Sequence, residues 1–395
     1  MQDQITIVFH TVFPFHDALL QPIAEQVKSA GIQVCRVTSL EEIASCRPKV
    51  IVTAHGPNPL YRNIAPQAMV VFTRHGFSWK KVFRRVAEAS DYTCMPSPWI
   101  TNDAIARGVR PRLGFWNTGF VGMDVVFRAL REDSLRQPLP LLAQAPPHSH
   151  VLLYAPTFNE EFSAESVLGP EWIGRLRQAF PDLCILIKPH PVTADRQPAW
   201  VRRWHKAATV DPWVRLSENF HEDIYPYFLF ADALLTDASS IMFYFLAMDK
   251  PILLVTNPRR SQSIKYYDPE GPEWTWRDMG VEIGNPTDLM EAVGEALADP
   301  QKHAERRRFY RERVFGEMTD GRAAERIAER IIALLRPPSE QAEWVRQAWW
   351  AHATLRERDQ RIALLEAEKA QPLTKIISAR IAARFSAHWR RLKAG

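Results

Sequence analysis

Residues 231–256, ADALLTDASSIMFYFLAMDKPILLVT, carry the pattern that decides the predicted fold. Residues 231–236 form a short apolar run broken by one aspartate, and residues 251–256 form another, so both are predicted to be buried parallel strands. The apolar stretch 241–248 between them predicts a helix. A strand, a helix and a second strand in this order make one unit of a parallel α/β sheet.

Polar residues stand where the first strand of this unit meets its helix. Asp237, Ser239 and Ser240 come at the start of the helix, whose first backbone N–H groups have no partner within the helix. A strand-to-helix turn of this kind binds anions, phosphate above all. The alternative is that Asp237 or Ser239 only caps the helix.

The same alternation of strands and helices covers most of the chain. In the first half, strands are predicted at 5–9, 33–37, 50–54, 69–73 and 92–95, and helices at 17–30, 41–45 and 98–107. In the second half, strands are predicted at 151–155, 183–188 and 214–216, ahead of the unit at 231–256. The proline-rich stretch QPLPLLAQAPPHSH at 137–150 separates the two series and is predicted to be a linker.

These two series predict an α/β protein with GT-B architecture, in which two doubly wound, Rossmann-like domains face a cleft and a C-terminal helical extension follows. The predicted bounds are 1–136 for an N-terminal domain, 137–150 for the linker, 151–336 for a C-terminal domain and 337–395 for the extension. In such a fold the site lies at the carboxyl ends of the strands.

Composition excludes several classes of protein. Of the residues, 46% are hydrophobic and 24% charged, as in a soluble globular protein. The net charge of +5 comes from residues 371–395, which hold six Lys or Arg and no acid, so no nucleic-acid groove is expected across the body. The four cysteines lack metal spacing and predict buried thiols in a reducing compartment. Without a signal-peptide pattern or a membrane-spanning run, a cytoplasmic location is expected.

Two histidines follow predicted strands, one in each half of the chain. His75 comes after residues 69–73, and Gly76 beside it allows close approach of a substrate or of backbone. Lys188 and His190 follow the apolar part of the second strand, residues 183–187. A lone histidine near an apolar strand is more often structural, but imidazole is also suited to accept a proton from a hydroxyl near neutral pH. The lysine could hold a pyrophosphate and stabilise a leaving phosphate.

Five motifs in this order resemble the CDP-glycerol glycerophosphotransferase family, to which teichoic acid primases and polymerases belong. The motifs are RHGFSWK at 74–80, APT at 155–157, IKPHP at 187–191, TDASSIMFYF at 236–245 and DGRAAERI at 320–327. The resemblance covers about residues 69–335. Asn159 stands where the family usually has an arginine, and Ala238 where it has a tyrosine.

The resemblance implies that residues 1–136 form the acceptor domain and 151–336 the donor domain, and it implies roles for particular residues. His75 is expected to be the general base on an acceptor hydroxyl, and His190 to act at the donor phosphates. The predicted donor-binding residues are Thr157, Lys188, Asp237, Ser239, Ser240, Asp320 and Gly321. Gly76 and Lys80 are predicted on the acceptor side.

The implied reaction is transfer of an alditol phosphate, most simply glycerol phosphate from CDP-glycerol, to a cell-surface glycan or its lipid-linked precursor, with release of CMP. The alternatives are a GT-B glycosyltransferase that uses a nucleotide sugar, and a non-catalytic scaffold of a glycan assembly complex. No DxD pattern and no His/Cys cluster with ligand spacing occurs, so no tightly bound metal is predicted. A loosely bound Mg²⁺ that arrives with the nucleotide remains open.

The C-terminal extension contains two amphipathic patterns. Heptad a and d positions over 339–369 predict a helix that forms a short coiled coil in a homo-oligomer or lies on the body. In 372–395 one helical face is apolar and the rest of the circumference is basic, a division that suits an anionic membrane surface at the inner face of the cytoplasmic membrane. The apolar face of 372–395 is predicted to consist of Leu373, Ile377, Ile381, Phe385, Trp389 and Leu392. The alternative is packing on the protein or in a dimer.

Overall fold

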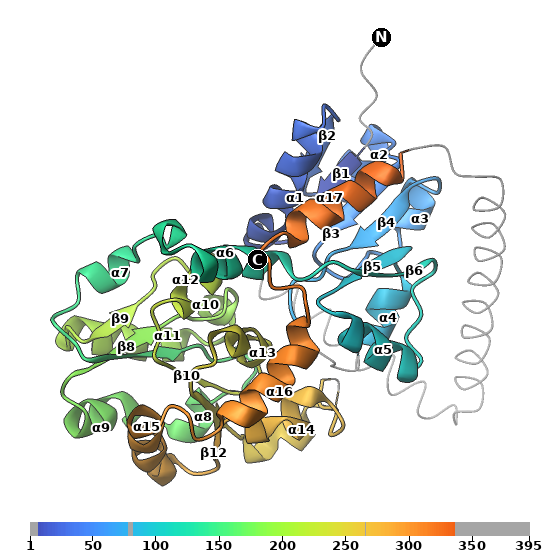
Figure 1. Ribbon diagram of the computed structural model, residues 1–395. Helices are drawn as coiled ribbons and strands as arrows, with labels where there is room; N and C mark the ends of the chain where they lie inside the picture. The colour runs from blue at the N-terminus through green and yellow to red at the C-terminus, as the bar shows by residue number, and fades with distance from the viewer. Residues whose placement is uncertain (1–6, 78–81, 265, 336–395) are drawn as a thin grey trace, which may run out of the picture. The chain divides into compact units, whose positions relative to one another are not determined.

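The computed structural model describes residues 7–77, 82–264 and 266–335 of the chain. These residues form two six-stranded sheets in which every strand pair is parallel, with helices on the faces of each sheet (Figure 1). The predicted α/β class with two doubly wound sheets is confirmed. The predicted helical extension at 337–395 lies outside the described residues.

The N-terminal sheet has the strand order β2-β1-β3-β4-β5-β6. Its strands are β1 (Ile7–His10), β2 (Val34–Val37), β3 (Val50–Thr53), β4 (Met69–Phe72), β5 (Tyr92–Met95) and β6 (Gly114–Asn117). The first five match predicted strands, whereas β6 was not predicted. Its sequence GFWN begins with glycine and is only partly buried, because β6 lies at the edge of the sheet.

Helices connect these strands and cover both faces of the sheet. They are η1 (Pro14–His16), α1 (Asp17–Ser29), α2 (Leu40–Cys46), α3 (Tyr61–Ile64), α4 (Val82–Glu88), α5 (Pro98–Ala106), η2 (Val121–Met123), α6 (Asp124–Arg131), η3 (Asp133–Leu135) and α7 (Pro140–Ala143). Local sequence explains several starts. Ser39 and Glu42 form a capping box at α2, and Ser97 accepts the Ile100 N–H at 3.2 Å at α5. The predicted linker at 137–150 contains α7.

The C-terminal sheet has the order β12-β11-β10-β7-β8-β9. Its strands are β7 (His150–Tyr154), β8 (Leu183–Ile187), β9 (Val214–Leu216), β10 (Ala233–Thr236), β11 (Ile252–Val255) and β12 (Val281–Ile283). β8, β10 and β11 are buried along their whole length, as expected for central parallel strands. The short edge strand β12 was not predicted, since VEI is too brief for a periodic pattern.

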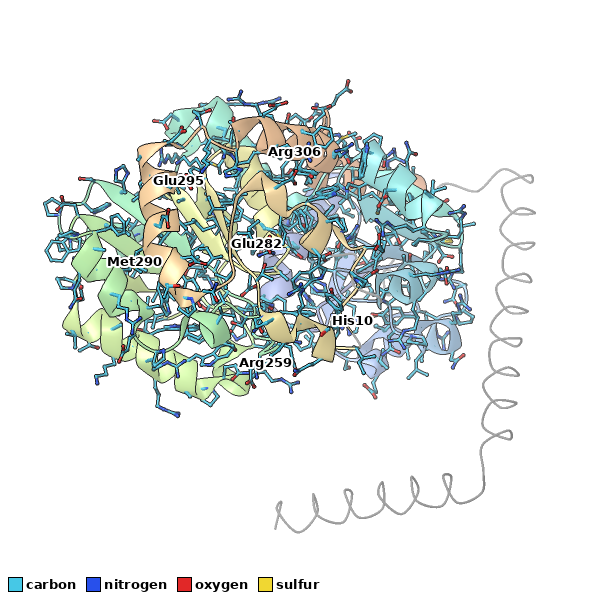
Figure 2. The ribbon with its side chains drawn as sticks, turned by 90° about the horizontal axis from the view of Figure 1, so that it is seen from below. His10, Arg259, Glu282, Met290, Glu295 and Arg306 are labelled. Carbon is cyan, nitrogen blue, oxygen red and sulfur yellow. The ribbon has the colours of Figure 1, made fainter. Side chains whose placement is uncertain are left out.

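The helices of this half surround its sheet. They are α8 (Glu165–Leu168), α9 (Trp172–Ala179), α10 (Thr193–Arg196), α11 (Pro198–Val210), α12 (Tyr225–Phe228), α13 (Ile241–Phe245), η4 (Leu246–Met248), η5 (Pro258–Gln262), α14 (Pro272–Thr275), η6 (Arg277–Met279), η7 (Pro286–Asp288), α15 (Leu289–Ala298) and α16 (Ala304–Phe315). The predicted helix at 241–248 is thus α13 continued by η4. Figure 2 shows α15, with Met290 and Glu295, on one side of the view and His10, which ends β1, on the other.

The last described helix, α17 (Ala323–Ala333), returns to the N-terminal sheet and packs against α1 (Figure 1). Ile327 and Ile331 are fully buried in the same cluster as Ile23 and Val27 of α1. The chain therefore crosses between the two sheets a second time after α16. The predicted bounds of 151–336 for the donor domain include this helix, although its contacts are with the first half.

Two further sequence predictions concern the body of the protein. All four cysteines are free, with Cys94 and Cys184 buried and Cys35 and Cys46 half-buried. Among the described residues, no helix combines the length and the apolar composition that a membrane crossing requires.

Candidate functional site

A cavity of about 130 Å³ lies at the carboxyl ends of the strands and takes its walls from both halves of the chain. His75 contributes from the first half. Lys188, His190 and Ser239 contribute from the second half. These four predicted site residues, from three motifs that are distant in the sequence, are therefore brought together by the fold.

The segment after β4 turns sharply and presents His75. Arg74 adopts a left-handed backbone conformation with φ of 66°, which is unusual for a residue with a side chain. Its buried guanidinium lies 4.4 Å from the centre of the Phe83 ring, and burial lowers the Arg74 pKa to about 10. Arg74 thus stays charged near neutral pH and anchors the turn, while the next residue, His75, is exposed.

The orientation of the His75 ring is fixed by backbone. Its Nδ1 lies 2.8 Å from the carbonyl oxygen of Ala54, which follows β3. Because a carbonyl oxygen only accepts hydrogen bonds, Nδ1 carries the proton in the neutral ring. Nε2 then holds a lone pair, as a general base requires.

Two of the predicted site residues, Gly76 and Ser240, approach each other closely beside this histidine. A Cβ atom built on Gly76 would lie 3.1 Å from Ser240 Oγ. Next to this contact the ring of Phe77 packs on Phe243 of α13 with centroids 4.5 Å apart. Phe120 stacks on Tyr244 at 4.4 Å. The aromatic residues of α13 therefore hold the first half of the chain against the helix that carries the serines.

Lys188 lies just beyond the end of β8 and is almost fully buried. Its Nζ donates to the Phe220 carbonyl oxygen at 3.1 Å, and the carboxylates of Glu222 and Asp223 are nearby. Burial lowers the Lys188 pKa to about 8, and the two carboxylates oppose that shift. The lysine is thus a positive charge that the protein has already desolvated beside the cavity.

His190 lies two residues further on. Its Nδ1 accepts the Val192 backbone N–H at 3.3 Å, so in the neutral ring the proton is on Nε2. Phe158 packs on this ring with centroids 4.7 Å apart. A fixed imidazole with an N–H donor beside a lysine suits contact with a phosphate oxygen.

The serines at the start of α13 are half-buried. Ser239 Oγ lies 3.5 Å from the Ile241 backbone nitrogen, a long contact that leaves the hydroxyl able to turn toward the cavity. Ser240 precedes the first residue of the helix. Both alternatives stated for Ser239, capping and ligand binding, remain compatible with this geometry.

Two other predicted donor residues lie beneath the cavity. The Asp237 carboxylate is fully buried and accepts the N–H groups of Thr157, at 3.0 and 3.1 Å, and of Ala164, at 2.9 Å. This contact ties β10 to the loop that follows β7. Asp237 and Thr157 therefore shape the floor, and neither is among the residues that line the cavity.

The late motif lies elsewhere, at the start of α17. Asp320 forms an ion pair with Arg326. Gly321 has a φ of 72°, and a Cβ atom there would lie 2.9 Å from the Asp124 carbonyl oxygen. The Asp124 carboxylate accepts the backbone N–H groups of Ala323 and Ala324, both at 2.9 Å. The carbonyl oxygens of Asp320 and Gly321 accept hydrogen bonds from Arg131 and Arg128 of α6, both at 3.1 Å, so the two residues join the start of α17 to α6 outside the lining of the cavity. Lys80, predicted on the acceptor side, lies outside the described residues.

The lining of the cavity also includes residues that were not predicted as site residues, among them Phe15, His221, Asp223 and Tyr225. Burial raises the Asp223 pKa to about 6, against hydrogen bonds and the charge of Lys188 that lower it. His221 and Asp223 follow the predicted strand at 214–216, so the strand-end rule that selected His75 and His190 would also have selected them.

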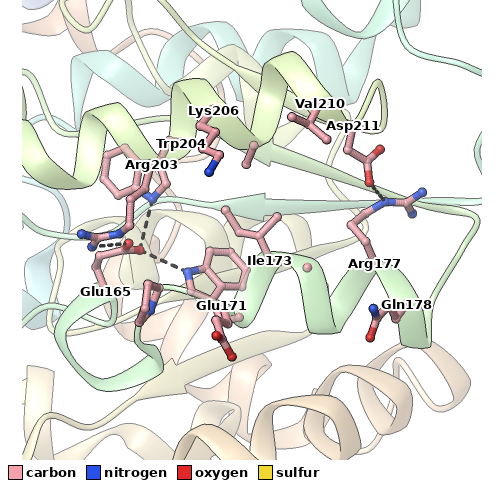
Figure 3. Close-up of a pocket in the computed structure, with 14 residues that line it drawn as sticks. Glu165, Glu171, Ile173, Arg177, Gln178, Arg203, Trp204, Lys206, Val210 and Asp211 are labelled. Carbon is pink, nitrogen blue, oxygen red and sulfur yellow. Dashed lines mark hydrogen bonds and ion pairs between the residues drawn. The ribbon is translucent and has the colours of Figure 1, made fainter.

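A larger cavity of about 700 Å³ lies between α9 and α11 (Figure 3). Four of its charged residues form two ion pairs with each other. Glu165 forms an ion pair with Arg203 at 2.9 Å and accepts the Trp172 and Trp204 N–H groups, while Arg177 pairs with Asp211 at 2.9 Å. These contacts fasten α8, α9 and α11 to one another. The smaller cavity at the strand ends is therefore the candidate site.

Comparison with known proteins identifies the family of the chain. The family model described as CDP-Glycerol:Poly(glycerophosphate) glycerophosphotransferase matches residues 25–333. A teichoic acid glycerol-phosphate transferase of Staphylococcus aureus (strain NCTC 8325 / PS 47) is 22% identical over 316 residues, which are 71% of this chain and 75% of that protein.

Solved structures share the fold. A variant of the wall teichoic acid polymerase TagF is 16% identical with a TM-score of 0.65, over 84% of this chain and 89% of that chain. The same variant after a soak with CDPG gives a TM-score of 0.61 at 16% identity, over 84% and 88% of the two chains. A UDP-GlcNAc 2-epimerase from Neisseria meningitidis has a TM-score of 0.54 at 16% identity, over 83% and 99%. The similarity to TagF confirms the predicted GT-B architecture.

Proposed function

Because the chain belongs to the CDP-glycerol:poly(glycerophosphate) glycerophosphotransferase family and is a transferase, we propose that it moves glycerol phosphate from CDP-glycerol to a hydroxyl of a cell-surface glycan or its lipid-linked precursor. A glycerol-phosphate transferase of teichoic acid synthesis is among its relatives. The CDPG soak of the related TagF variant supports CDP-glycerol as the donor. The observation that carries the proposal is that His75 lines the same cavity as Lys188, His190 and Ser239.

In this reaction the acceptor oxygen attacks the β-phosphorus of the donor. The new P–O bond forms as the bond from that phosphorus to the oxygen bridging the two phosphates breaks, and CMP leaves with the bridging oxygen. The acceptor proton goes to Nε2 of His75, which the Ala54 carbonyl keeps free of its own proton. Lys188, His190 and Ser239 stabilise the negative charge of the donor and of the departing CMP.

Product analysis tests this proposal. The purified full-length protein would be incubated with CDP-glycerol, CDP-ribitol and several nucleotide sugars, each with a glycan acceptor. We expect CMP and a glycerol-phosphate product. Release of a nucleoside diphosphate would instead identify a glycosyltransferase, and turnover of no donor would identify a scaffold.

No step requires a tightly bound metal. A Mg²⁺ carried by the nucleotide is detected as stimulation of the same assay by MgCl₂.

A peripheral location at the inner face of the cytoplasmic membrane belongs to the same proposal. Its support is the sequence of residues 372–395, which lie outside the described residues, with one apolar and one basic helical face. Each basic residue near an anionic surface contributes about 1 kcal/mol. Deletion of 372–395 is therefore expected to release the protein from anionic liposomes while turnover of a soluble acceptor survives. Failure of the full-length protein to bind such liposomes at low salt would favour packing on the protein or in a dimer.

A further inference from the structure

Three histidines of the first half lie together beside the cavity. His16 precedes α1, His55 follows β3 and His75 follows β4. The strands β1, β3 and β4 are neighbours, so the three loops meet at one edge of the sheet. One ring nitrogen of each histidine lies within 4.8 Å of the other two. The ring centroids are 5.0 Å apart for His16 and His75, and 5.6 Å for the other two pairs.

His16 is fully buried, yet in the described part of the chain neither of its ring nitrogens has a hydrogen-bond partner. Burying a polar group of this kind without a hydrogen-bond partner or a bound ion costs free energy of folding. Burial lowers the His16 pKa to about 2, and the neighbouring histidines shift it in the same direction. The ring is thus held neutral, which is the form of histidine that ligates metals. Nδ1 of His55 is also buried and without a partner among the described residues.

The surroundings resemble those of a metal site. Phe13 packs on the rings of His16 and His55 at 5.5 and 5.3 Å, and Phe15 packs on His16 at 4.5 Å, so the cluster has an apolar wall. On the other side, His75 donates its Nδ1–H to the Ala54 carbonyl. A hydrogen bond from the second ring nitrogen to a carbonyl is the contact that usually orients a metal-ligating histidine.

We propose that His16, His55 and His75 form a three-histidine site for a divalent transition-metal ion of the zinc class. Imidazole ligands favour such ions, whereas Mg²⁺ and Ca²⁺ require oxygen ligands. A tetrahedral zinc ion with Zn–N distances of about 2.0–2.1 Å holds its nitrogens about 3.4 Å apart, so the rings must close by roughly an ångström. Three protein ligands leave the fourth position facing the cavity, since His75 is the exposed member.

The consequence for activity rests on the proposed function. A metal on Nε2 of His75 occupies the lone pair that accepts the acceptor proton. The ion therefore blocks the base, and zinc inhibits transfer until a chelator removes it. The site couples the enzyme to the availability of free zinc.

The test measures binding and activity separately on the full-length protein. Calorimetry with ZnCl₂, and the visible absorption of tetrahedral Co²⁺, are recorded without donor or acceptor. We expect one equivalent of zinc for the native protein and for the control His221→Asn, which changes a nearby cavity histidine outside the cluster. His16→Asn and His55→Asn should each weaken zinc binding about 100-fold or more, because loss even of an outer contact costs 10–100-fold. Thermal unfolding of both variants verifies that they fold.

Activity assays complete the test. CMP release by the native protein should fall with added zinc and return with chelator, whereas His55→Asn should resist zinc. Absence of stoichiometric zinc binding, or binding that survives both substitutions, overturns the site. Loss of activity in chelator with recovery in zinc overturns the blocking role. Because binding is measured without substrates, a protein that binds zinc yet transfers no glycerol phosphate keeps the site and refutes only the proposed function.

Discussion

Gly76 and Ser240 approach so closely that a Cβ atom on the glycine would lie 3.1 Å from the serine Oγ and 3.6 Å from its Cβ. The two residues belong to different halves of the chain, one beside the predicted base and the other at the predicted phosphate site. Each of the two residues lies next to a residue that lines the cavity, His75 and Ser239. The smallest side chain is needed on one side because the hydroxyl occupies the other.

Replacement of Gly76 by alanine is therefore expected to destabilise the protein by about 1–3 kcal/mol, the usual effect of overpacking. The second substitution Ser240→Ala removes the closer atom and leaves a contact of ordinary length. The midpoint of thermal unfolding should fall in Gly76→Ala and recover in the double variant. A double variant no more stable than Gly76→Ala would show that the clash is not with Ser240.

His75→Ala should remove transfer but retain donor binding, because a general base acts on the acceptor. Loss of a positioned base lowers the rate about 10²- to 10⁴-fold. CMP release gives the rate and calorimetry with CDP-glycerol gives the affinity. Donor affinity that falls in step with the rate would assign His75 to the donor side instead.

His190→Ala and Ser239→Ala should weaken donor binding as well as the rate. A hydrogen bond to a charged group contributes about 1.5–3 kcal/mol, which corresponds to roughly 10- to 150-fold in affinity. His205→Ala is the matched control, since that histidine is 44% exposed and pairs with Glu218 on the surface. Unchanged affinity in both site variants would exclude the two residues from the donor site.

Donor affinity should depend on pH through Lys188. Its pKa of about 8 means that the ammonium is charged below pH 8 and loses its proton above it. A phosphate binds the charged form, so affinity should be highest below about pH 8 and fall as the pH rises further. Lys188→Met should bind more weakly at pH 7 and show no such fall. An identical pH profile in both proteins would contradict the role of Lys188.

Asp124→Ala should destabilise the protein because α17 loses the carboxylate that accepts two of its first N–H groups. Loss of a helix cap costs about 0.5–2 kcal/mol. Urea unfolding measures this change in the free energy of unfolding. Asp124→Asn keeps one acceptor oxygen and should lose less. Equal stability of Asp124→Ala and the native protein would show that packing on α1 alone holds α17.

The sequence was sufficient for most of the architecture because its strands are continuous apolar runs. Runs such as Leu183–Ile187 are buried over their full length and stand out from their flanks. The edge strands β6 and β12 were missed, since hydrogen bonding to a neighbour defines them more than their composition does. The return of α17 was missed for a similar reason. An amphipathic helix has an apolar face, but its sequence does not indicate which surface covers that face.

The candidate site shows the same limit. The strand-end rule selected His75, Lys188 and His190, which line one cavity. The same rule also selected Asp237, although its carboxylate accepts hydrogen bonds from backbone N–H groups and does not line the cavity. Side-chain direction decides between these outcomes, and it depends on contacts from distant segments. The histidine cluster also escaped detection, because His16, His55 and His75 become neighbours only when three parallel strands are aligned.

The packing of α17 on α1 also has a consequence for synthesis on the ribosome. α1 ends at Ser29, whereas its covering helix begins only at Ala323. At about 5–20 residues per second, the ribosome needs roughly 15–60 s to make the chain between them. Ile23 and Val27 remain uncovered by α17 during that interval. The apolar face of α1 that α17 covers is therefore completed only when almost the whole body has been made.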